Sequence, residues 1–109
     1  MDLLLKALGD FTRFRILELL LDEERTQKEL LDLLGIDKGV VSGHVEKLLG
    51  AGLVARRSPR GKCYLVRPRL TLPVLQKVAD LSEALAEAEA REAARRAQRL
   101  RQVPTLDNA

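Results

Sequence analysis

Apolar residues in the first half of the chain recur at steps of three and four, the spacing of one face of an α-helix. The sets that show this spacing are Phe14, Leu17, Leu20 and Leu21; Leu30, Leu31 and Leu34; and Val41, Val45 and Leu48. Asp10 stands where it would cap the first of these helices, which we expect to end near Leu21. A shorter apolar helix is predicted over residues 2–8, ending at Gly9.

The second and third apolar sets belong to helices that are predicted to meet at a tight corner. Thr26 and Glu29 have the spacing of a capping box, which satisfies free N–H groups at a helix start. Gly35 stands where a helix leaves through a left-handed residue, and Ile36 is expected to be a buried plug in the corner. Asp37 is expected to cap the following helix, residues 38–49. A short helix, a corner and a second helix with a polar outer face are typical of a helix-turn-helix.

The pattern then changes from helical to that of a β-hairpin. Residues 53–57 and 62–67 are predicted strands, and residues 58–61 have the composition of a turn. Because a two-stranded hairpin is not stable alone, we expect this wing, residues 53–67, to pack against the helices. The expected fold class is mainly α with a small β-hairpin, a winged helix-turn-helix over residues 1–70 with a long C-terminal dimerisation helix.

The last segment, residues 71–102, is predicted to be that helix, packed on the same domain. It begins near Thr71, with Pro73 in its first turn, and at 1.5 Å per residue it would be roughly 45 Å long. A seam with alternating steps of four and three is typical of a helix pair and contains Val74, Val78, Leu81, Leu85 and Ala88. We therefore expect this helix to meet a second chain, and we expect residues 103–109 to be disordered.

Positive charge is concentrated in and just after the wing. The net charge is only +3, but residues 56–69 hold six cations and no carboxylate: Arg56, Arg57, Arg60, Lys62, Arg67 and Arg69. A projecting hairpin with cations suits a phosphate backbone, and an arginine can enter the narrow minor groove. We therefore predict that Arg56, Arg57, Arg60 and Lys62 contact double-stranded DNA.

The outer face of helix 38–49 is the other predicted DNA-binding surface. Its residues are Lys38, Gly39, Val40, Ser42, Gly43, His44 and Lys47. Lys38 and Ser42 have side chains for bases or phosphates, and Val40 suits a thymine methyl group. Gly39 and Gly43 either let the backbone approach DNA closely or mean that few bases are contacted directly. For His44 a phosphate contact and an ordinary surface position are both open.

The sequence shows no arrangement typical of an enzyme, a metal site or a cofactor site. The chain has one histidine and one cysteine, Cys63, so there is neither a zinc-ligand spacing nor an internal disulfide. We expect Cys63 to be a small strand residue; a redox role, with its pKa lowered by neighbouring cations, is the alternative. Neither a signal peptide nor a membrane span is indicated, and we expect a cytoplasmic protein.

Three segments resemble the ArsR family of small winged-helix transcriptional repressors. They are LKALGDFTRFRILELL at residues 5–20, ELLDLLGIDKGVVSGHVEKLLGAGLV at residues 29–54, and GKCYLV at residues 61–66. The resemblance implies a homodimer that binds operator DNA and releases it when an effector binds. It also implies that the first and last helices form the dimer interface, which adds Leu3 and Leu4 to the seam of the last helix.

The chain departs from the family pattern in places that bear on function. Phe11 replaces the usual proline, and Thr26-Gln27-Lys28 stands where many members have a metal-binding Cys-x-Cys. Residues 72–102 contain no histidine, so the second metal site of the family does not carry over either. Gly43 stands where a longer polar or basic side chain is usual, which weakens the case for base contacts.

These observations predict a DNA-binding transcriptional regulator, a homodimeric repressor of a palindromic operator. Two-fold symmetry would place its recognition helices in successive major grooves, ~34 Å apart. Two alternatives remain: a winged helix that binds a protein through its long last helix, and an architectural protein with little sequence specificity.

Overall fold

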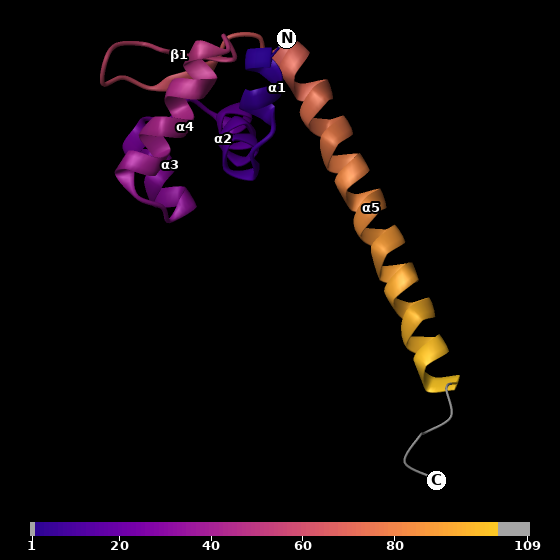
Figure 1. Cartoon of the computed structure of the whole chain (residues 1–109). Coiled ribbons are helices and arrows are strands. Elements are labelled where there is room, and N and C mark those ends of the chain that lie inside the picture. The colour runs from indigo at the N-terminus through magenta and orange to yellow at the C-terminus, as the bar shows by residue number, and fades with distance from the viewer. Residues whose placement is uncertain (1, 103–109) are drawn as a thin grey trace. The chain divides into compact units, whose positions relative to one another are not determined.

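The computed structural model describes residues 2–102, so the tail predicted at residues 103–109 lies outside the described part of the chain. Figure 1 shows the elements in the predicted order. They are α1 (Asp2–Leu8), α2 (Phe11–Asp22), α3 (Gln27–Leu34), α4 (Lys38–Gly50), β1 (Val54–Arg56), β2 (Cys63–Leu65) and α5 (Pro68–Gln102). The first compact unit ends at Leu75 and the second begins at Gln76, within α5. The predicted fold class, a mostly helical winged helix with one hairpin, is confirmed.

The core of the first unit is built from the predicted apolar stripes. Ile16, Leu17 and Leu20 of α2 pack with Leu30 of α3 and with the stripe of α4, and all are buried. The α4 stripe is Val41, Val45 and Leu48, as predicted. Ile36 is only half-buried and packs on the edge of this core, so the expected plug in the corner is partial.

Side-chain caps set the starts of two helices. The Asp10 carboxylate accepts hydrogen bonds from the N–H groups of Thr12 (2.8 Å) and Arg13 (3.1 Å), which begins α2 where predicted. The Thr26 hydroxyl accepts from the Glu29 N–H at 3.1 Å and begins α3. Asp37 holds the N-cap position of α4, but its side chain makes no capping hydrogen bond, so that part of the prediction was wrong.

Positive backbone angles occur where helices must turn sharply. Gly35 has φ 67° at the end of α3, and Gly52 has φ 77° after α4. These are left-handed conformations that glycine adopts without steric cost. The predicted left-handed exit at Gly35 is confirmed.

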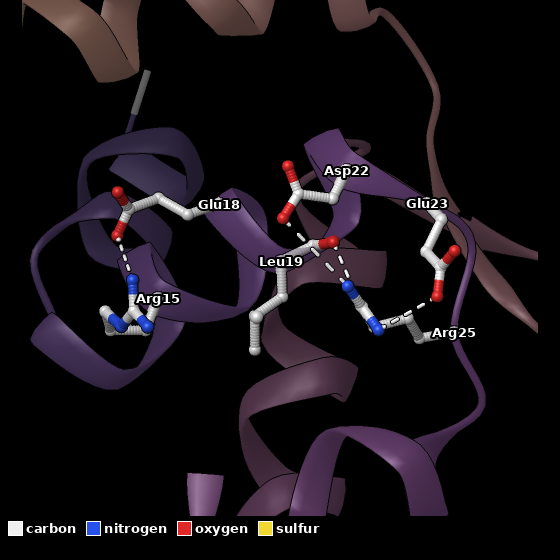
Figure 2. A network of polar contacts seen from close by, with 6 residues as sticks. All are labelled: Arg15, Glu18, Leu19, Asp22, Glu23 and Arg25. Carbon is white, nitrogen blue, oxygen red and sulfur yellow. Dashed lines mark hydrogen bonds and ion pairs between the residues drawn. The ribbon is translucent and has the colours of Figure 1, made fainter. Parts of the chain in front are cut away.

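An arginine also closes the C-terminus of α2. The Nε of Arg25 donates to the Leu19 carbonyl at 3.1 Å, and its Nη1 lies 3.1 Å from the Glu23 carboxylate (Figure 2). The backbone of Arg25 pairs with that of Cys63 in both directions, at 3.1 and 2.7 Å. Arg25 thus ties the loop before α3 to the returning strand of the wing.

The wing is a short antiparallel hairpin. Val54 pairs with Leu65 and Arg56 with Cys63, and the Gly61 N–H donates to the Ser58 carbonyl at 2.9 Å in the turn. The strands are three residues each, shorter than predicted. Val54, Cys63 and Leu65 are buried in the core, which confirms that the hairpin packs on the helices.

Helix α5 begins earlier than predicted. Pro68, not Thr71, is its first residue, and the Arg67 carbonyl accepts from the N–H of Thr71 at 2.9 Å and from its hydroxyl at 2.8 Å. Proline is favoured at a first helical position because its missing N–H would have no partner there. Pro73 therefore lies inside the helix rather than in its first turn.

Candidate nucleic-acid interface

Helix α4 presents a small, partly polar surface opposite its buried stripe. Lys38, Gly39, Gly43 and Lys47 are exposed, and Ser42 is half-buried. Val40 is 47% exposed, an apolar group without a packing role inside the chain. These predicted DNA-binding residues therefore lie on the accessible side of the helix, where a ligand can reach them.

The two glycines of this face are not required by packing within the chain. A Cβ atom built at Gly39 or at Gly43 would meet nothing within 4 Å. Each glycine costs up to ~1 kcal/mol of helix stability relative to alanine, and no internal contact offsets this cost. The surface is left shallow at these two positions, so a partner can come close to the helix backbone.

His44 lies at the inner edge of α4, with its side chain only 17% exposed. Its Nδ1 is 3.1 Å from Nη1 of Arg13 and 3.9 Å from the Asp10 carboxylate. The ring is therefore engaged with α2 and its cap. This geometry gives no support to the phosphate contact predicted for His44, and the ring is not an ordinary surface side chain either.

Two of the four wing cations are paired with carboxylates from other elements. Nη2 of Arg56 lies 2.6 Å from the Glu46 carboxylate on α4, and Nη1 donates to the Pro59 carbonyl at the wing tip (3.3 Å). The charge excess along residues 56–69 is therefore partly compensated in space. Arg56 links α4 to the turn of the wing.

Arg57 makes the second such contact, at the base of the wing. Its Nε and Nη2 donate to the two oxygens of Glu24 at 2.9 and 2.6 Å, and its guanidinium lies 4.1 Å from the centre of the Tyr64 ring. These bonds lower the pKa of the Glu24 carboxyl and raise that of Arg57. Arg60 and Lys62 are exposed and have no ion-pair partner among the described side chains.

A cleft of about 510 Å³ lies between the wing tip and the starts of α3 and α4. Its lining residues are Thr26, Gln27, Lys28, Lys38, Arg56, Pro59, Arg60 and Gly61. Four of them are cationic and none is acidic, which suits a phosphate backbone. Gln27 and Lys28 were not predicted for this surface, because in the sequence they stand out only where the ArsR family has metal ligands.

Cys63 is fully buried in the core. Burial raises the pKa of its thiol and outweighs the lowering effect of Arg56. The sequence-based alternative of a thiol activated by cations was wrong in direction, since removal from water disfavours the thiolate. Cys63 is a small packing residue of β2.

The apolar residues predicted for a dimer interface are exposed in the single chain. In the first unit Leu3, Leu4 and Val74 are exposed, and Leu4 and Val74 line an apolar groove of about 280 Å³. In the second unit Val78 and Ala88 are exposed, as are Leu81 (60%) and Leu85 (55%). The predicted seam is thus available for contact with another surface.

The described residues 2–102 contain no group of three or more His, Cys, Asp or Glu side chains placed to hold a metal ion. None of their helices is both long enough and apolar enough to span a membrane.

The chain matches known proteins in sequence and in structure. The MarR family model matches residues 10–62. No curated protein sequence matches. Among solved structures, HlyU from Vibrio cholerae superposes with a TM-score of 0.61 and 28% identity, over 71% of this chain and 88% of that one.

Two mycobacterial structures match similarly. The cadmium metal-sensor CmtR from Mycobacterium tuberculosis has a TM-score of 0.57 and 32% identity, over 72% of this chain and 86% of that one. The homodimeric winged helix-turn-helix DNA-binding domain of a possible ArsR-family transcriptional regulator from Mycobacterium bovis has a TM-score of 0.59 and 28% identity, over 69% and 73%. The chain belongs to the winged helix-turn-helix transcriptional regulators of the ArsR and MarR type.

Proposed function

We propose that this regulator is a cytoplasmic, homodimeric repressor that binds a palindromic operator through α4 and the wing. The observation that carries the proposal is the cleft whose cations, Lys28, Lys38, Arg56 and Arg60, come from three separate elements. A cationic concavity beside an exposed helix face matches the groove and backbone of duplex DNA. The Mycobacterium bovis domain, which is described as DNA-binding and homodimeric, supports the same function.

Within this proposal the elements have different tasks. Lys38, Ser42 and Lys47 on α4 contact base edges or phosphates, and Val40 contacts a thymine methyl group. Arg60 and Lys62 of the wing contact phosphates. Because the glycines contribute no side chain, few bases are contacted directly and much of the affinity comes from phosphate contacts.

The proposed dimer uses the exposed apolar residues of α1 and α5. In the first unit it would bury Leu3, Leu4 and Val74, and in the second unit Val78, Leu81, Leu85 and Ala88. Burying such side chains against a second copy removes their apolar surface from water, which is favourable by about 25 cal/mol per Å² before the cost of association.

Selection of bound sequences from a pool of random duplexes tests the proposal. A recovered palindrome, with half-sites about one helical turn apart, is expected. Binding without any recovered motif would support an architectural role instead, and no binding above background would support a protein-interaction module. The exposed, shallow face at Gly39 and Gly43 is the observation that favours these alternatives.

A further inference from the structure

Arg13 is a buried cation to which the proposed DNA contacts assign no role. It lies on α2 and is 8% exposed. Its Nε donates to the Ala7 carbonyl at 2.8 Å, and its Nη2 donates to the Lys6 carbonyl. Both carbonyls belong to the last turn of α1, where a helix lacks internal donors. Arg13 therefore closes the end of α1 from the neighbouring helix.

The remaining arm of the same guanidinium reaches α4. Nη1 of Arg13 lies 3.1 Å from Nδ1 of His44. A guanidinium has only donors, so Nδ1 must accept, and a histidine that accepts at Nδ1 is neutral with its proton on Nε2. The α1, α2 and α4 helices pack on one another, and this arginine of α2 makes polar contacts with the other two.

Asp10 gives His44 an alternative partner. Its carboxylate lies 3.9 Å from the same Nδ1. Burial opposes ionisation of Asp10, but the hydrogen bonds from the N–H groups of Arg13 and Thr12, together with nearby positive charge, outweigh it and lower its pKa. Once Nδ1 of His44 is protonated, it and Nη1 of Arg13 are both donors and can no longer form a hydrogen bond. The charged ring would then pair with the Asp10 carboxylate instead.

Other charged groups stand on α4 and on the elements packed against it. Among the side chains of residues 3–102, Asp10 is the one carboxylate within ion-pair distance of the ring. On α3, Glu29 bonds Thr26; on β1, Arg56 pairs with Glu46. Lys6 of α1 contributes its carbonyl to Arg13, and Lys47 follows one turn after His44 on α4 itself.

We propose that Arg13 is a positioning residue for the recognition helix, joining the end of α1 to α4 through neutral His44, so that DNA affinity falls when His44 is protonated. This inference rests on the proposed DNA binding and names a condition for it. It links α1, which carries Leu3 and Leu4 of the proposed dimer interface, to α4, which carries the proposed base contacts.

The direction of the pH effect separates this role from a phosphate contact. A histidine on a phosphate gains affinity when it becomes charged, so DNA binding would tighten on acidification. A histidine that must accept from Arg13 loses its contact when charged, so binding would weaken. Histidine changes charge between about pH 5 and 8, which makes both outcomes measurable under mild conditions.

The experiment combines NMR of the ring with DNA affinity. Because His44 is the only histidine, its nitrogen signals need no assignment. We expect the Nε2–H tautomer at pH 8. We expect DNA affinity to fall about tenfold for each protomer, the size expected for loss of a hydrogen bond to a charged group, over the pH range in which the NMR signals report protonation of the ring. The Nδ1–H tautomer, or affinity that is constant or rises on acidification, would overturn the proposal.

Three variants complete the test. In His44→Gln the side chain at position 44 cannot be protonated, so we expect a DNA affinity that does not change with pH. If the affinity of this variant fell on acidification as much as that of the wild type, another group would cause the pH dependence and the proposal would be overturned. Arg13→Lys keeps the charge but cannot span three acceptors, and we expect weaker binding at pH 8 with a smaller pH dependence. Asp10→Asn removes the carboxylate with which the charged ring would pair, and we expect a smaller loss of affinity on acidification in this variant.

Failure of the proposed function has a different signature. Wild-type protein that binds no duplex at pH 8 would refute DNA binding itself, whereas the tautomer of His44 and its response to Arg13→Lys would still show whether the Arg13–His44 contact exists. Circular dichroism of each variant identifies loss of fold. If Arg13→Lys unfolds, the pH profile of His44→Gln carries the test alone.

Discussion

Removing the two unpaired wing cations should flatten the salt dependence of DNA binding. Arg60→Ala with Lys62→Ala deletes two phosphate contacts in each wing, hence four in a homodimer. Each contact contributes about 0.9 to the slope of log affinity against log salt, so the slope should fall by roughly 3.6. Between about 50 and 200 mM salt the wild type should then lose about 150-fold more affinity than the variant.

Fluorescence anisotropy with the selected operator at several salt concentrations measures this slope. Arg95→Ala with Arg99→Ala is the matched control, because it also lowers the net charge of +3 by two but alters neither α4 nor the wing. We expect its slope to stay near that of the wild type. An unchanged slope in the Arg60 and Lys62 variant would show that the wing tip does not contact DNA phosphates. An equally reduced slope in the control would show that the net charge of the protein, and not the wing, determines the salt dependence.

Three further predictions concern the core, the helix face and the dimer. Cys63, being fully buried, should react with Ellman's reagent only as the protein unfolds, and labelling as fast as in denaturant would contradict its place in the core. Gly43→Ala should raise the free energy of unfolding in urea by up to ~1 kcal/mol. A lower free energy of unfolding would show that packing within the chain requires glycine at this position. Leu81→Glu with Leu85→Glu should give monomers in sedimentation equilibrium; intact dimers would place the interface elsewhere.

Much of the fold was predictable because its determinants are local in sequence. The caps at Asp10 and Thr26 and the exit at Gly35 each depend on residues within one turn of the chain. The apolar stripes indicated which side of each helix is buried. The start of α5 was missed because two prolines, Pro68 and Pro73, both lie near it, and composition does not tell which one occupies the first turn.

The candidate site was less predictable because its charges are balanced by distant residues. Residues 56–69 contain no carboxylate of their own, yet Arg57 is paired with Glu24, which lies 33 positions away. His44 was placed on the outer flank of its helix, yet it meets Arg13, 31 positions away. Periodicity gives the face of a helix, but it does not give the side chain that an adjacent element places opposite that face.

The paired arginines change how the wing contributes to DNA binding. An arginine held by a carboxylate must give up that partner before it can contact a phosphate, so Arg56 adds little to the salt slope while its pair with Glu46 is closed. The contacts of Arg56 with Glu46 and the Pro59 carbonyl meanwhile hold the wing tip against α4 in the free protein. Glu46→Gln should therefore raise affinity for any duplex and steepen the salt slope by about 0.9 per wing, since it frees one cation. A ratio of operator to random-duplex affinity that falls in this variant would show that Glu46 limits non-specific binding, whereas an unchanged slope would show that Arg56 stays at the wing tip and never reaches the phosphates.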